Sequence, residues 1–226
     1  MNPSYEITKS LPKFLPPTEA HPVGVRILDY GSSIRVDYEG VRDLVPMLHK
    51  TYAGTVDIVL HIGMASGRKH YTIERYGHRD GYEKNKDLDG LVPTGDTLSC
   101  FADCPATLTT SLDYVGILQR WQDSVRRTNT DKITINKEEL QSSEDAGNFL
   151  CDYIYFNSLA WFGRRSQVFD GPPSAHRPVL FLHVPADSSE DGLERGRLVT
   201  VGLIRAMADG WAVGEEPGYK AATPAG

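Results

Sequence analysis

The chain has 226 residues, a length that suggests one domain or a large single α/β domain. Its residues are 40% hydrophobic and 24% charged, an ordinary globular composition that excludes a disordered or fibrous chain. Its formal net charge of −6 gives no sign of the basic surface that phosphate backbones require, so we predict no nucleic-acid partner. Three cysteines are too few and odd in number for a disulfide framework, which favours a reducing compartment.

The sequence shows neither a membrane segment nor a secretion signal. Its apolar runs fall short of the roughly 18 residues that a membrane span needs. The first residues also lack the basic segment and following apolar run of a signal peptide. We therefore expect a cytoplasmic protein with no membrane partner.

The first half of the chain predicts strands, one helix and long loops. Prolines predict a loop over residues 12–23, and a short strand over 25–30 follows. Asp37 is expected to cap a helix with apolar residues at helical spacing. An unbroken apolar run over residues 55–63 predicts a strand buried on both faces. Residues 64–110 are polar and glycine-rich, so we expect long, functional loops with one hairpin at most.

The second half continues the alternation of strands and helices. The pattern predicts helices over residues 111–127, 148–161 and 198–211, and strands over 132–136 and 178–185. This order predicts an α/β fold of three layers, α/β/α, with helices on both faces of the sheet. We expect one domain over residues 1–213 and a frayed tail over 214–226.

The segment around Cys151 is the first candidate for chemistry. Gly147 can interrupt the preceding segment, and Asn148 can cap a helix that starts after it. Cys151 would then lie in the first turn of that helix. The positive end of a helix lowers a thiol pKa, and a thiolate is the nucleophile that attacks an amide. Asp152 opposes ionisation, so a histidine partner is needed. The plain alternative is a small buried hydrophobic residue.

Histidine residues near strand ends are candidates for that partner. His183 ends a buried strand, where α/β folds place their active sites, and its imidazole can shuttle the thiol proton. His61 is an equal candidate on this argument, and a satisfied core histidine is the plain alternative. Weaker candidates lie in predicted loops: His70, His78 and His176.

Glu74 is the candidate for the third position of a triad. Its apolar neighbour Ile73 indicates a sheltered carboxylate, which can accept an imidazole N–H and fix the tautomer. The plain alternative is a solvated charge paired with Arg68 or Arg75.

The remaining cysteines do not form a recognisable metal site. Cys100 and Cys104 have no second pair and no nearby histidine to complete tetrahedral ligation, so we predict no metal.

Three motifs resemble those of the pyroglutamyl peptidase I family, a family of cysteine peptidases. They are a Ser/Thr-x-Glu-Lys/Arg core at residues 72–75, a nucleophile signature at 143–152 and a strand ending His-Val-Pro at 181–185. The resemblance implies that Cys151 is the nucleophile, His183 its base and Glu74 the residue that orients the base.

The family implies a mixed, mostly parallel sheet and hydrolysis of the amide bond after an N-terminal pyroglutamyl residue. A peptide with that residue would be the partner, and no cofactor would be required. Two alternatives stay open: a catalytically silent homologue that binds peptides, and a related cysteine amidase.

The N-terminus departs from the family pattern. Asn2 to Tyr5 matches an element that follows the first strand and an aromatic loop in the family, and here Met1 stands directly before it. We therefore expect the first family strand to be missing, with weak activity and marginal stability as the result.

Overall fold

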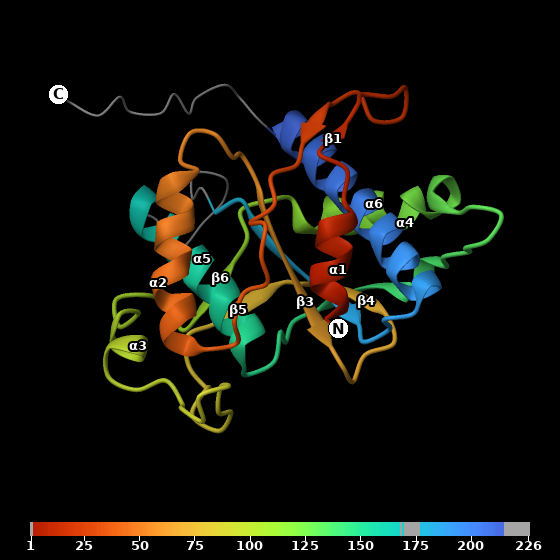
Figure 1. The fold of residues 1–226 in the computed structure, drawn as a ribbon. Helices are drawn as coiled ribbons and strands as arrows, with labels where there is room; N and C mark the ends of the chain where they lie inside the picture. Colours follow the sequence, from red (N-terminus) through yellow and green to blue (C-terminus); the bar gives the residue numbers. More distant parts are fainter. Residues whose placement is uncertain (1, 168, 170–176, 215–226) are drawn as a thin grey trace.

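The computed structural model describes residues 2–167, 169 and 177–214 (Figure 1). The helices are α1 Pro3–Ser10, α2 Tyr38–Thr51, α3 Asp96–Ser99, α4 Tyr114–Thr128, α5 Leu150–Ser166 and α6 Glu190–Gly214, with a 3-10 turn η1 at Lys137–Glu139. The strands are β1 Phe14–Leu15, β2 Val25–Arg26, β3 Val59–Ala65, β4 Tyr71–Glu74, β5 Tyr76–His78, β6 Thr107–Thr109, β7 Leu140–Ser143 and β8 Val179–Pro185. Residues 215–226 of the expected tail lie outside the described residues.

The central sheet has the strand order β3-β8-β4-β7. β3 pairs with β8 in parallel, and β4 pairs with β7 in parallel. β8 and β4 are antiparallel. The predicted mixed, mostly parallel sheet is therefore confirmed. Two further two-stranded ladders, β1-β2 and β5-β6, lie outside it.

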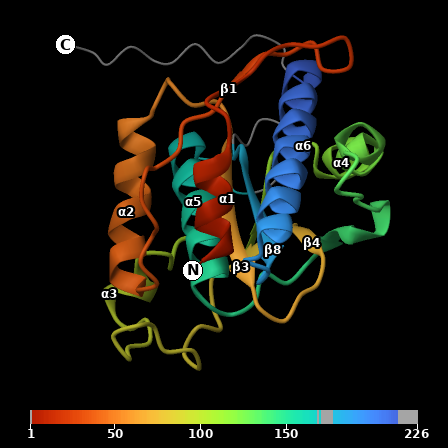
Figure 2. The same cartoon turned by 45° about the vertical axis from the view of Figure 1, so that its right-hand side comes forward.

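Helices cover both faces of this sheet, as predicted. In Figures 1 and 2, α2 and α5 lie on one side of β3, and α6 and α4 lie on the other. Each side has its own apolar core. One is centred on Trp121 of α4 and Leu203 of α6, and the other on Tyr153 and Phe156 of α5. Burial of these large side chains is the main force that holds the three layers together.

The predicted helix after Asp37 forms as expected. The Asp37 side chain accepts a hydrogen bond from the Gly40 N–H and so caps α2. Val41 and Val45, one turn apart, are buried against the α5 layer.

Three strand predictions need correction. The strand expected over residues 25–30 is limited to β2, because only β1 pairs with it. The strand expected over 55–63 begins later, and it is only half-buried because β8 is its only partner among the described strands. Residues 132–136 form no strand: Ile133 and Ile135 are buried, but Ile135 N–H donates to the Asn129 side chain instead of to a ladder.

The segment expected to be a loop, residues 64–110, contains a strand of the central sheet that the sequence pattern did not predict. β4, which carries Glu74, lies in the interior of the sheet between β8 and β7. All four of its residues are buried. Because β4 is short and charged residues flank it, its sequence lacks the apolar pattern of a buried strand. It becomes buried only because β8 and β7 pair with both of its edges.

Two histidines, buried His49 of α2 and half-buried His61 of β3, share one serine hydroxyl. His49 Nε2 lies 3.0 Å from Ser158 Oγ, and His61 Nε2 lies 2.7 Å from the same atom. Ser158 has one hydroxyl proton, so it donates to one ring and accepts from the other when both rings are neutral. Burial lowers the pKa of His49 to about 4 and that of His61 to about 3.

This cluster predicts a loss of stability in acid. Unfolded histidine titrates near its ordinary pKa of about 6.5, so below that pH the unfolded chain binds more protons than the folded one. The free energy of unfolding is expected to fall as the pH drops from about 6.5 towards 4, by up to about 1.4 kcal/mol per pH unit for each ring. Urea unfolding at pH 7, 6 and 5 measures this slope. The double variant His49→Gln/His61→Gln is expected to flatten it, and an unchanged slope would contradict the assignment.

No helix within the described parts of the chain is long and apolar enough to cross a membrane.

Candidate active site

One face of the central sheet brings the three predicted residues to the same region. His183 of β8 lies opposite Thr72 of β4, and Glu74 lies opposite Phe181. Opposed residues in a ladder point to the same face of the sheet, so Glu74 and His183 emerge together. Helix α5, which begins with Leu150, packs on this face and carries Cys151 in its first turn.

A buried hydrogen bond joins Glu74 to His183. The Glu74 Oε1 and His183 Nδ1 atoms are 2.7 Å apart, and both residues are buried. This contact leaves Nε2 as the ring nitrogen that can exchange a proton with a reacting group. The alternative of a solvated glutamate is therefore wrong, although its expected partner is present: Arg68 also donates to Glu74 Oε1.

Cys151 approaches the sheet beside His183. Gly63 of β3 is paired with His183, and a Cβ built on Gly63 would lie 3.0 Å from Cys151 Sγ. No hydrogen bond joins Cys151 to His183 among the described contacts, and catalytic contacts commonly tighten only when substrate binds. The Cys151 thiol thus lies next to the Glu74–His183 pair but is not hydrogen-bonded to His183.

The resting thiol is protonated, contrary to the sequence-based expectation of a lowered pKa. Burial first, and then the charges of Glu74 and Asp152, raise the pKa of Cys151 to about 11, while Arg68 acts in the opposite direction. The helix also begins one residue later than predicted, with Phe149 and not Asn148 at the N-cap. Phe149 provides no capping side chain, so no side chain from that position occupies the N–H groups of the first turn.

The close approach of α5 to the sheet requires a glycine at position 63. An alanine Cβ there would lie 2.6 Å from the Phe181 ring and 3.0 Å from Cys151 Sγ. Gly63→Ala is expected to destabilise the fold by about 1–3 kcal/mol and to displace the thiol. Urea unfolding and the rate of Cys151 alkylation measure the two effects. Gly67→Ala is the matched control, because nothing lies within 4 Å of its built Cβ; equal behaviour of the two variants would contradict the prediction.

A second buried carboxylate lies next to the nucleophile position. The Asp152 side chain accepts from the His78 N–H at 3.0 Å, from His78 Nδ1 at 3.2 Å and from the Tyr82 hydroxyl at 3.2 Å. Burial raises the pKa of Asp152, and the hydrogen bond to Asp152 raises the pKa of His78. His78 was expected in a loop, but it ends β5 and pairs with β6. The sequence offered no signal for this contact beyond the adjacency of Asp152 to Cys151.

The other histidine and cysteine candidates are not part of this cluster. His61 contacts Ser158, and His70 lies between β3 and β4. His176 lies outside the described residues. Cys100 and Cys104 are free thiols, and among the described residues no group of three or more metal-binding side chains occurs.

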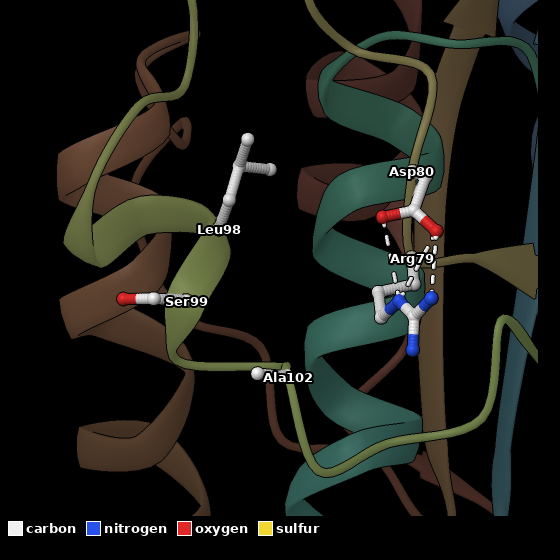
Figure 3. Close-up of a pocket in the computed structure, with 5 residues that line it drawn as sticks. All are labelled: Arg79, Asp80, Leu98, Ser99 and Ala102. Atoms are coloured by element: carbon white, nitrogen blue, oxygen red, sulfur yellow. Dashed lines mark hydrogen bonds and ion pairs between the residues drawn. The ribbon is translucent and has the colours of Figure 1, made fainter.

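An open pocket of about 340 Å³ lies elsewhere, beside α3. Figure 3 shows its lining, with Arg79 and Asp80 joined to each other on one side. Leu98, Ser99 and Ala102 line the other side. None of the three predicted catalytic residues lines it, so it is separate from the candidate active site.

Comparison with known proteins gives two kinds of similarity. No protein-family model matches the chain. Pyroglutamyl-peptidase 1 of Rattus norvegicus is 30% identical over 146 residues, which are 64% of this chain and 62% of that protein. Pyroglutamyl-peptidase 1 of Homo sapiens is 30% identical over 141 residues, 62% of this chain and 60% of that protein. The match thus spans less than two thirds of the length of these curated relatives.

Solved structures show the same fold over nearly the whole chain. The pyrrolidone carboxyl peptidase from Thermococcus litoralis has a TM-score of 0.65 at 18% identity and covers 98% of this chain and 92% of its own. The pyrrolidone carboxyl peptidase from Thermus thermophilus has a TM-score of 0.58 at 23% identity, covering 93% and 92%. The chain is therefore related in sequence to pyroglutamyl-peptidase 1 and has the fold of the pyrrolidone carboxyl peptidases, which confirms the predicted resemblance to the pyroglutamyl peptidase I family.

Proposed function

We propose that the chain is a cysteine peptidase that hydrolyses the amide bond after an N-terminal pyroglutamyl residue. The observation that carries the proposal is the buried Glu74–His183 pair at the sheet position beside Cys151. A carboxylate, an imidazole and a thiol in this order are the parts of a nucleophilic triad. The similarity to pyroglutamyl-peptidase 1 supplies the substrate class.

His183 acts as the base in the first step. Its Nε2 accepts the thiol proton while Cys151 Sγ attacks the pyroglutamyl carbonyl carbon. The raised thiol pKa means that the nucleophile is generated by this transfer and is not stored as a thiolate. Glu74 holds the ring and stabilises the imidazolium that forms, as the acid of a triad does.

The tetrahedral intermediate then collapses to a thioester. His183 returns the proton to the leaving amine, and the C–N bond breaks. Water, deprotonated by His183, attacks the thioester and releases pyroglutamate and the free thiol. Uncapped N–H groups at the start of α5 are the proposed donors to the oxyanion in both intermediates.

Specificity is proposed to come from a small apolar pocket that accepts the lactam ring. Such a pocket has no partner for the charged amine of an ordinary N-terminus, so binding of that amine would cost its desolvation. The partner is then a peptide with N-terminal pyroglutamate.

A substrate panel tests the proposal. The chain is expected to release aminomethylcoumarin from its pyroglutamyl derivative and not from the prolyl or glutamyl derivatives, which lack the lactam carbonyl or the ring. Prior alkylation with iodoacetamide is expected to stop the release. Cleavage of all three substrates at similar rates would favour a broader cysteine amidase. No cleavage of any substrate would favour a silent, peptide-binding homologue.

A further inference from the structure

Arg68 joins three segments around the candidate active site. It lies in the turn between β3 and β4, where its N–H donates to the Ala65 carbonyl at 3.1 Å. Its guanidinium donates to Glu74 Oε1, to the Asp145 carbonyl at 2.7 Å and to Ser143 Oγ at 3.4 Å. One planar guanidinium therefore links β4, the end of β7 and the loop that leads to α5, which carries Cys151.

The contact with Glu74 cannot be a solvated surface pair. The Glu74 side chain has 0% exposure, and that of Arg68 has 25%. His183 and Arg68 share Oε1, while Glu74 Oε2 has no hydrogen-bond partner. The position of the carboxylate therefore depends on these two hydrogen-bond partners. If Arg68 is removed, Glu74 is free to rotate and to present either oxygen to His183.

The second contact acts on the nucleophile side. The loop over residues 144–149 connects β7 to α5, and Gly147 within it has a φ of 81°, a backbone conformation that glycine adopts at the least cost. The Arg68 bond to Asp145 O ties this loop to Glu74. Among the described residues, Arg68 is thus the only side chain that hydrogen-bonds both to the Glu74 carboxylate and to the loop that leads into α5 and Cys151.

We propose that Arg68 is a positioning residue of this site, which holds Glu74 against His183 and fixes the loop before Cys151. The proposal rests on the peptidase function proposed above. Arg68 does not touch the thiol and is not a catalytic residue. Sequence reasoning considered it only as a partner that would make Glu74 an ordinary surface charge.

The charges around Cys151 provide an independent readout. Three charged groups act on it: Glu74 from β4, Asp152 from α5 and Arg68 from the turn. Burial and then the two carboxylates raise the pKa of the thiol, and Arg68 lowers it. His78 is paired with Asp152, whereas the Glu74 charge is paired with Arg68. Removal of the arginine charge is therefore expected to move the ionisation of Cys151 to higher pH.

Three variants test the role. Arg68→Met removes both the charge and the planar fork of donors, and Arg68→Lys keeps the charge alone. Arg75→Met is the matched control, since Arg75 follows Glu74 directly in the chain but pairs with Glu144 at the surface. Alkylation of Cys151 by iodoacetamide is followed against pH through the mass of its peptide, and kcat and KM are measured on pyroglutamyl-aminomethylcoumarin. Arg68→Met is expected to slow alkylation at pH 8 about tenfold, which corresponds to one pKa unit. It is also expected to lower kcat more than it raises KM.

Arg68→Lys is expected to keep the wild-type alkylation profile while its kcat falls, and Arg75→Met to match the wild type in both. A folded Arg68→Met with the wild-type profile and kcat would overturn the proposal. If Arg68→Met does not fold, Arg68→Lys decides, because wild-type kcat in that variant would overturn it too. Absence of turnover in the wild type would refute the peptidase, whereas the alkylation profiles would still report on Arg68.

Discussion

Replacement of Cys151 by serine is expected to lower kcat/KM for pyroglutamyl-aminomethylcoumarin by at least about 10⁴-fold. A serine hydroxyl ionises far less readily than a thiol, and the surroundings of position 151 already oppose a negative charge. Glu74 and Asp152 both face the site, so a serine alkoxide would be less stable still. The rate at which purified wild-type and variant chains release fluorescent aminomethylcoumarin measures the ratio of their kcat/KM values.

Cys100→Ser is the matched control for this change. Cys100 is a half-buried free cysteine whose Sγ donates to the Thr97 carbonyl, a contact that a serine hydroxyl can reproduce. This variant is expected to keep the wild-type turnover. Equal rates for Cys151→Ser and the wild type would remove Cys151 from the mechanism, whatever the substrate.

Replacement of Glu74 by glutamine is expected to lower kcat by about 10³- to 10⁴-fold, the order found when a triad carboxylate is neutralised. The amide can keep the shape of the side chain, but it cannot stabilise the imidazolium that His183 becomes. It also leaves Arg68 without its counter-charge. Loss of these charged hydrogen bonds is expected to cost about 2 kcal/mol of stability, which urea unfolding measures.

Glu144→Gln is the control for the Glu74 variant. Glu144 pairs with Arg75 at the surface, and its side chain is 66% exposed. Exposed ion pairs contribute little to stability, so this variant is expected to behave as the wild type in both assays. A Glu74→Gln variant with unchanged kcat would show that His183 needs no carboxylate and would reduce the triad to a dyad.

The long periodic helices and strands could be predicted from the sequence because the patterns that indicate them lie within each segment. Asp37 followed by spaced valines predicts α2, and the apolar run from Val179 predicts β8. The motifs around Glu74, Cys151 and His183 likewise identified the residues that the sheet brings to one face. Their roles in catalysis remain predictions, and so does the cytoplasmic location.

β4 and residues 132–136 show where local signals fail. β4 is short and flanked by charges, and it is a strand because β8 and β7 pair with both of its edges. Ile133 and Ile135 alternate like a strand and are buried like one, but no segment among the described residues pairs with them in a ladder. Whether an extended segment becomes a strand depends on its partners, which lie far away in the sequence.

The sequence by itself determined the α/β class, the long helices and the identity of the candidate catalytic residues, because these depend on side-chain periodicity and on motifs of neighbouring residues. Only the tertiary structure decided the ionisation of Cys151, which burial and two carboxylates set against the helix dipole. Only it revealed Arg68 at the junction of Glu74 and the nucleophile loop. Both outcomes depend on desolvation and on distances between segments far apart in the chain, which a linear pattern does not record.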